Sequence, residues 1–178
     1  LMYDKNTTAD KKIAVVEIGS ALTHAHPRSR MACGVYAFIL WAILDDPCKE
    51  SVYRGLRAAE DFYTEKGKTN DNYASEIVRF GRLFDKNFAK LPRDRIKSSG
   101  YVIDSLEAAV WCLLTTDNYV DCVLKAVNLG SDTDTIGAIA GGLAGATYGY
   151  DAIPKTWRET LVRREYIESL CEKVSFVR

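Results

Sequence analysis

The sequence predicts an all-α protein, a compact multi-helix domain of about eight helices spanning residues 1–178. Apolar residues recur at helical spacing in several segments, whereas no convincing segment alternates with the period of two that is typical of a strand. Four glycines at positions 137, 141, 145 and 149 are spaced four residues apart, which places them on one face of a helix. Because 47% of the residues are hydrophobic, the chain can form one substantial core.

The first half is predicted to contain four helices. An early helix ends near residues 23–27, and a strongly apolar helix follows from about Ser29 to Leu44, ahead of a proline. Two further helices are predicted near 49–66 and 71–88, the second with Asp71 as its candidate N-cap.

The second half begins with a predicted loop over 89–101, where a proline and a Ser-Ser-Gly sequence interrupt any helix. Apolar stripes then mark three helices. Their members are Ile103, Leu106, Val110 and Leu113; Val120, Val123, Leu124 and Val127; and Ile167, Leu170, Cys171 and Val174. The glycine row predicts a helix packed closely on a neighbour, because glycine costs about 1 kcal/mol relative to alanine inside a helix. Pro154 suits the first turn of another helix, on which Trp157 and Leu161 share a packing face.

Composition limits the class of protein. The formal net charge is zero and no basic stripe is interleaved with aromatics, so binding to nucleic acid is not expected. The five cysteines form no C-x-x-C pair, which favours reduced thiols in a cytoplasmic protein over disulfides or a zinc site. The apolar run from Ile136 to Tyr150 is shorter than the roughly 20 residues of a membrane span, so no membrane association is expected. The chain begins at Leu1 and lacks a signal peptide, and we expect it to be a fragment.

The segment D-T-D-T at 132–135 sets two carboxylates and two hydroxyls at the start of the glycine-rich helix. Hard oxygens at such a position suit a hard divalent cation or a phosphate. A calcium-binding EF-hand loop is excluded because Ile136 and Leu143 occupy two of its ligand positions. A simple helix N-cap remains an equally good explanation from chemistry alone.

Two other segments could carry chemistry. Thr23-His24-Ala25-His26-Pro27 holds two histidines that could bind a metal if extended, although one of them could equally pack or cap at the turn. Ser99-Gly100-Tyr101 forms a small turn that places an aromatic ring at a helix entrance. Such a turn can support a ring or a ribose, but it is also a common setting for a core tyrosine.

Taken together, four ordered motifs resemble the ADP-ribosylglycohydrolase family. They are T-H-A-H-P at 23–27, S-G-Y-V-I-D-S-L-E-A-A-V-W at 99–111, A-V-N-L-G-S-D-T-D-T-I-G-A at 126–138 and I-P-x-x-W at 153–157. The resemblance extends from Thr23 to Leu161. It implies an all-helical fold, two bound Mg²⁺ ions (or Mn²⁺), and removal of ADP-ribose from a modified protein or a small adduct.

The resemblance also implies roles for individual residues. The implied metal ligands are Asp132, Asp134 and Thr135, whose oxygens suit Mg²⁺. The residues implied to bind ADP-ribose are His24, Ser99, Gly100 and Tyr101. We therefore expect these two groups to lie around one cleft.

The chain also departs from the family pattern. It has neither the G-D-x-x-G segment nor the T-D-D or S-D-D segment of the family's N-terminal half, and Asp45-Asp46 looks like a solvated helix end. The chain thus resembles the C-terminal part of a member, and the resemblance implies that the other metal ligands and a catalytic carboxylate lie outside it. The leading hypothesis is a hydrolase active only with that N-terminal half, which could be a separate chain. The alternative is a non-catalytic relative, crystallin-like or ADP-ribose-binding. Retention of both carboxylates in D-T-D-T favours the hydrolase, and the bond that it cleaves stays open.

Overall fold

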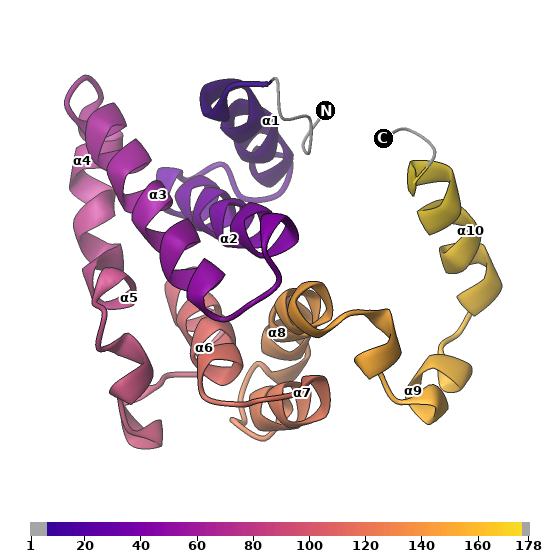
Figure 1. The fold of residues 1–178 in the computed structure, drawn as a ribbon. Coiled ribbons are helices and arrows are strands. Elements are labelled where there is room, and N and C mark those ends of the chain that lie inside the picture. The colour runs from indigo at the N-terminus through magenta and orange to yellow at the C-terminus, as the bar shows by residue number, and fades with distance from the viewer. Residues whose placement is uncertain (1–6, 176–178) are drawn as a thin grey trace.

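The computed structural model describes residues 7–175, apart from the side chains of residues 174 and 175, and within that range every regular element is a helix (Figure 1). The α-helices are α1 (Ala9–Ala21), α2 (Pro27–Asp45), α3 (Glu50–Gly67), α4 (Asp71–Ile77), α5 (Gly81–Phe84), α6 (Val102–Leu114), α7 (Tyr119–Val127), α8 (Thr133–Tyr148), α9 (Lys155–Thr160) and α10 (Arg164–Ser175). Short 3-10 helices span Val78–Phe80, Phe88–Lys90, Arg93–Arg95 and Tyr150–Ala152. The all-α prediction is confirmed, with more helices than the expected eight because several are short.

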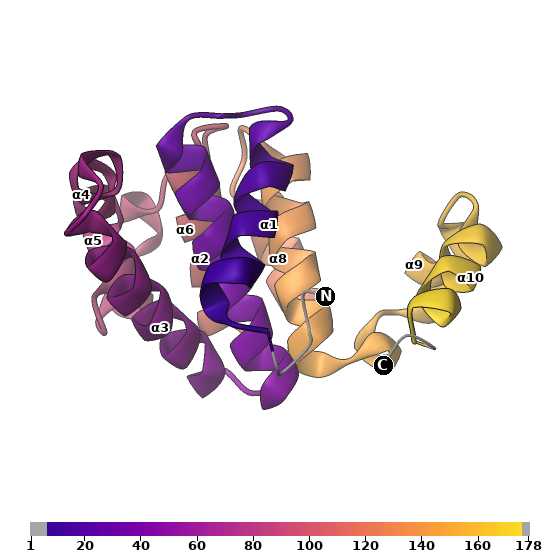
Figure 2. The same ribbon diagram turned by 90° about the horizontal axis from the view of Figure 1, so that it is seen from above.

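Helix α2 lies at the centre of the fold. It packs against α1, α3, α4, α6 and α8, while α8 also packs on α6 and α7. Viewed from above, α1, α2, α6 and α8 form a bundle, α3 to α5 cover one flank, and α9 and α10 extend away on the other (Figure 2). The bundle therefore carries the core, and the C-terminal pair of helices stands apart from it.

The core follows the predicted apolar stripe of α6 most closely. Ile103, Leu106, Val110 and Leu113 are all at most 5% exposed. Burying a side chain of this kind contributes about 1.5–3 kcal/mol relative to leaving it exposed, so this helix is a main source of stability.

The helix predicted near 71–88 is wrong in its extent. Asn70 rather than Asp71 caps α4, because the Asn70 side chain accepts a hydrogen bond from the Asn72 N–H. The chain then passes through a 3-10 turn into a four-residue helix that starts at Gly81, a residue that disfavours helix interiors. The break lets the two large side chains of this segment, Phe80 and Leu83, both become fully buried.

The glycine row of α8 faces α7, as predicted, but only in part. A Cβ atom at Gly137 would lie 3.0 Å from Val127 Cγ1, which is tighter than most real contacts. At Gly141 and Gly145 it would meet α7 at 3.6 and 3.9 Å, which are ordinary van der Waals distances. Gly149 does not belong to the packed face, since it follows the helix with φ of 85° and has nothing within 4 Å. No helix in the described part of the chain has the length and apolar character that crossing a membrane requires.

The C-terminal apolar faces are more exposed than predicted. Trp157 is 36% and Leu161 51% exposed, and in α10 the side chains of Ile167 and Leu170 are 40% and 42% exposed. The side chain of Val174 lies outside the described residues. These faces have a helical pattern because α9 and α10 are amphipathic helices, yet the bundle does not cover them.

Candidate active site at the end of the helix bundle

Three loops meet at one end of the bundle: the α1–α2 connection, the loop before α6 and the loop before α8 (Figure 2). They surround a cavity of about 390 Å³. His24, Gly100, Tyr101 and Thr135 all line it, although they come from distant parts of the sequence. The T-H, G-Y and D-T-D-T segments thus reach one cavity, although of the D-T-D-T residues Thr135 lines it and Asp132 and Asp134 do not.

The two histidines of the first loop play different parts. His26 Nδ1 accepts a hydrogen bond of 3.2 Å from the Arg28 backbone N–H and so caps α2, with Pro27 in the first turn. The ring of His24 is exposed at the cavity, with Nδ1 3.0 Å from Thr23 Oγ1. The capping explanation thus applies to His26, and His24 remains available to a ligand.

Ser99 holds the turn before α6 rather than lining the cavity. Its hydroxyl donates to Asp104 Oδ2 at 2.7 Å and accepts from the Tyr101 N–H at 3.2 Å. Ser99 is not among the residues that line the cavity, contrary to the expectation for it. The physical reason is that both hydrogen bonds hold its side chain against the start of α6.

The loops before α6 and α8 are fastened to each other. The Asp132 N–H donates to the Ser98 carbonyl at 3.0 Å, and the Ser98 hydroxyl and Arg93 Nη2 both donate to the Leu129 carbonyl, at 3.3 and 2.5 Å. A Cβ atom at Gly100 would lie 3.3 Å from Asp132 Oδ2, so the missing side chain lets the two loops approach. Sequence reasoning missed Arg93 and Ser98 because these contacts join residues more than 30 positions apart.

The D-T-D-T segment enters α8 through a tight turn. Gly130 and Ser131 both have positive φ, 85° and 61°, and Ser131 is therefore a strained non-glycine residue. Asp132 precedes the helix but makes no side-chain cap hydrogen bond to its N–H groups. Instead its Oδ1 accepts from the Thr135 hydroxyl at 3.0 Å, while Asp134 Oδ1 accepts from the Thr135 N–H at 2.9 Å. The simple N-cap explanation therefore does not account for Asp132.

Carboxylate and hydroxyl oxygens such as those of Asp132, Asp134 and Thr135 are ligands of the type that a hard cation prefers. The hydrogen bond from the Thr135 N–H lowers the pKa of Asp134 below its usual range, and a hydrogen bond with the Asp132 side chain lowers it further. The Asp134 carboxylate is therefore ionised at neutral pH. Mg²⁺ prefers six oxygen ligands in octahedral geometry and commonly keeps several waters. In the described part of the chain, no group of three or more His, Cys, Asp or Glu residues could hold a metal ion. Asp132, Asp134 and Thr135 are thus suitable but form a partial ligand set.

The charged residue of the cavity lining, Arg28, was not predicted. Arg28 lines the cavity, and its Nε and Nη2 donate to Glu76 Oε2 and Oε1 at 2.6 and 2.9 Å. Its guanidinium carbon lies 5.7 Å from the centre of the Tyr101 ring. An arginine directly after His-Pro gave no local signal, because its carboxylate partner is 48 residues away.

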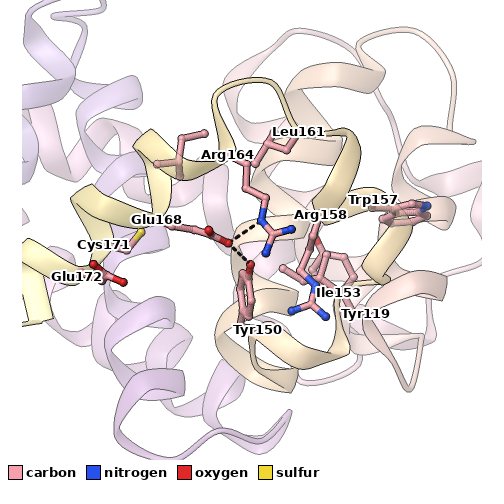
Figure 3. A pocket seen from close by; sticks show the side chains of 11 residues that line it. Tyr119, Tyr150, Ile153, Trp157, Arg158, Leu161, Arg164, Glu168, Cys171 and Glu172 are labelled. Carbon is pink, nitrogen blue, oxygen red and sulfur yellow. Dashed lines mark hydrogen bonds and ion pairs between the residues drawn. The ribbon is translucent and has the colours of Figure 1, made fainter.

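Other cavities lie elsewhere on the described part of the chain, and two of them have volumes of about 530 Å³ or more. An apolar groove of about 620 Å³ runs between α1, α2, α6 and α8 and adjoins the first cavity at Cys33, Val102 and Ile139. A second cavity, of about 530 Å³, lies between α7, α9 and α10 (Figure 3). There Tyr150 and Arg164 both donate to Glu168 Oε1 at 2.7 Å. Neither cavity contains a predicted site residue.

The all-helical bundle thus carries at one end the T-H, G-Y and D-T-D-T motifs on which the resemblance to the ADP-ribosylglycohydrolase family rests. The family model described as ADP-ribosylglycohydrolase matches residues 1–178, and the chain belongs to this family. The expected resemblance is thereby confirmed.

Individual relatives agree with the family assignment. The chain is 35% identical over 158 residues to the ADP-ribosylarginine hydrolase Tri1 of Serratia proteamaculans, covering 89% of this chain and 39% of the relative. It is 30% identical over 144 residues to the ADP-ribosyl-[dinitrogen reductase] glycohydrolase of Rhodospirillum rubrum, covering 79% and 40%. A solved structure titled ADP-ribosylglycohydrolase-related protein complex superposes with a TM-score of 0.75 at 29% identity, over 95% of this chain and 53% of that one. The chain therefore spans about two fifths of these curated relatives and about half of the solved structure.

Proposed function

We propose that this chain supplies part of the active site of a hydrolase that removes ADP-ribose from a modified protein or a small adduct. The observation that carries the proposal is the meeting of His24, Tyr101 and Thr135 of the D-T-D-T loop around one cavity. The names of two relatives, an ADP-ribosylarginine hydrolase and an ADP-ribosyl-[dinitrogen reductase] glycohydrolase, support an ADP-ribosylated protein as the substrate. ADP-ribosylarginine is accordingly the first substrate to test.

The proposed metal ligands are Asp132, Asp134 and Thr135, as part of a site for two Mg²⁺ ions, with Mn²⁺ as an alternative. A bound metal pair would hold the ribose hydroxyls or a water, position the anomeric centre and stabilise developing charge. Carboxylates bound to a cation stay ionised, so these two aspartates would not act as proton donors. Their role in this chain is to provide negative charge at the start of α8.

Three of the proposed ligand-binding residues, His24, Gly100 and Tyr101, line the cavity. His24 presents an exposed ring, and Tyr101, 41% exposed, offers an aromatic surface to a base or a ribose. Gly100 has no side chain, so the loop before α6 can approach the loop before α8. Ser99 acts indirectly, because its hydroxyl accepts a hydrogen bond from the Tyr101 N–H.

The proton-transferring group is proposed to come from outside these residues. The family resemblance implies a carboxylate for proton transfer, and in the described part of the chain no Asp or Glu lines this cavity. We therefore expect activity only when a further part of the protein, on the same or a separate chain, completes the site.

The test compares turnover of ADP-ribosylarginine in the presence of Mg²⁺ by this chain alone and by the protein that includes any residues encoded before Leu1. The expected result is little or no turnover by the chain alone and clear turnover by the longer protein. Full turnover by the chain alone would show that the proton carrier lies within it. Binding of ADP-ribose without turnover by the longer protein would favour the non-catalytic alternative.

Metal binding is tested by calorimetry on the longer protein. Asp134→Ala is expected to abolish Mg²⁺ binding, and Asp71→Ala is the matched control because Asp71 is an exposed aspartate in the first turn of another helix, α4. Unchanged Mg²⁺ binding in Asp134→Ala would leave that carboxylate with only its local hydrogen bond to Thr135.

A further inference from the structure

Arg28 is the side chain that gives the proposed ADP-ribose cavity a fixed positive charge. Among the described residues that line the cavity, the others are neutral or are the histidines His24 and His26. The Arg28 side chain is 22% exposed, so it is partly shielded from water yet accessible from the cavity. An interaction with an opposite charge is stronger at such a position than on an open surface.

Glu76 fixes the guanidinium without neutralising the site. Two N–H groups of Arg28, on Nε and Nη2, donate to the Glu76 carboxylate, which is 11% exposed. Arg79 also pairs with Glu76, at 3.3 Å, so the three side chains together carry a net charge of +1. A guanidinium has five N–H donors, and three of those on Arg28 remain for another partner.

Tyr101 places an aromatic surface beside this cation. The Arg28 guanidinium carbon lies 5.7 Å from the Tyr101 ring centre, within the range of a cation–π contact. An exposed ring next to a fixed arginine offers one surface for a planar base or a sugar and donors for an adjacent phosphate. Nucleoside diphosphates combine these two features in one molecule.

We propose that Arg28 binds the diphosphate of ADP-ribose through its remaining N–H groups, with Glu76 as the positioning residue that holds the guanidinium at the cavity wall. The inference rests on the proposed function and adds a specific contact to it. Arginine suits this contact because its planar, paired N–H groups match phosphate oxygens and stay charged at every physiological pH.

The test is calorimetric titration of the longer protein, which includes any residues encoded before Leu1, with and without Mg²⁺, using ADP-ribose, ADP and adenosine. Arg28→Gln is expected to weaken ADP-ribose and ADP binding about 10- to 100-fold and to leave adenosine binding unchanged, because only the phosphates lose a charged hydrogen bond. Arg79→Gln is the matched control. Arg79→Gln removes a positive charge that pairs with the same Glu76 carboxylate. Because Arg79 lies outside the cavity lining, ADP-ribose binding should stay within about twofold of wild type.

The outcomes separate the inference from the function on which it rests. Wild-type protein that binds no ADP-ribose overturns the proposed function together with the inference. Wild-type protein that binds, with equal affinity in Arg28→Gln, overturns the inference alone. If Arg28→Gln lowers the affinity for adenosine as much as the affinity for ADP-ribose, Arg28 supports only the position of Tyr101. That result also overturns the proposed phosphate contact. Circular dichroism verifies folding, and Arg28→Met, which keeps the apolar stem against Tyr101, gives the same test if Arg28→Gln does not fold.

Discussion

Replacement of Gly55 by alanine should destabilise the protein, because among the helical glycines Gly55 is the one at which a Cβ atom would come closest to backbone atoms of another helix. A Cβ atom there would lie 2.5 Å from Ile39 Cα and 2.7 Å from the Phe38 carbonyl oxygen. Both atoms belong to the backbone of α2, so no side-chain rotation can relieve the clash. The two helices must instead move apart by about 0.9 Å, the difference between 2.5 Å and an ordinary contact of 3.4 Å.

The expected loss follows from two opposing effects. Overpacking in a core costs about 1–3 kcal/mol, and a backbone clash belongs at the upper end of that range. Alanine recovers about 1 kcal/mol relative to glycine within a helix. The net loss is about 2 kcal/mol, which corresponds to a fall in melting temperature of about 4–8 °C for a domain of this size.

Thermal unfolding followed by circular dichroism measures this effect, with Gly19→Ala as the control. Gly19 also lies in a helix, α1, but a Cβ atom there has nothing within 4 Å. Gly19→Ala should therefore raise the melting temperature by about 1–4 °C, since it gains about 0.5–1 kcal/mol of helix propensity without a clash. A Gly55→Ala protein that melts at or above the wild-type temperature would refute the close approach of α2 and α3.

Three other substitutions or conditions give further tests. Gly100→Ala should leave the melting temperature nearly unchanged but weaken Mg²⁺ binding by the longer protein severalfold. The reason is that the new Cβ atom would lie 3.3 Å from Asp132 Oδ2 and displace that proposed ligand. An unchanged Mg²⁺ affinity in calorimetry would contradict this prediction. Glu17→Ala should cost about 3–5 kcal/mol in urea unfolding, because the buried carboxylate accepts from Arg30 and two tyrosines, and a loss below about 1 kcal/mol would contradict its role. Burial and Glu17 raise the pKa of Tyr73 to about 12 from an ordinary value near 10, so its contribution to stability is complete below pH 10 and is lost as the pH rises toward 12. Tyr73→Phe should therefore show a shallower decline in melting temperature over that window, and an identical decline would contradict the assignment.

The fold was predictable from the sequence wherever periodicity and packing agree. The stripe on α6 is buried as expected because that helix crosses the centre of the bundle. The break after Ile77 was not predictable, since it depends on burying Phe80 and Leu83 against helices that are distant in sequence. The exposed faces of α9 and α10 were mispredicted for a related reason: a helical apolar pattern indicates a face to be covered, but it does not show that the same chain covers it.

The site was predictable to the level of its loops but not of its supporting contacts. The T-H, G-Y and D-T-D-T motifs identified three segments, and the structure brings them to one cavity. The hydrogen bonds of Ser99 were not predictable, because a hydroxyl next to a binding loop can serve the backbone as readily as a ligand. Arg28 and Arg93 escaped notice because their partners, Glu76 and the Leu129 carbonyl, are far away in sequence.

The positions of the charged side chains around the cavity determine which end of the proposed ADP-ribose ligand lies on which side. Arg28 provides the positive charge beside Tyr101, whereas the D-T-D-T carboxylates lie at the start of α8, next to Gly100. A diphosphate is favoured at the first position and disfavoured at the second unless a cation binds there. Under the proposed function, the adenosine diphosphate end therefore lies toward Arg28, and the ribose that carries the acceptor bond lies toward the metal ligands. Because hydrogen bonds within the chain already fasten the loops, this polarity is set before a ligand arrives, which reduces the entropic cost of orienting the bond to be cleaved.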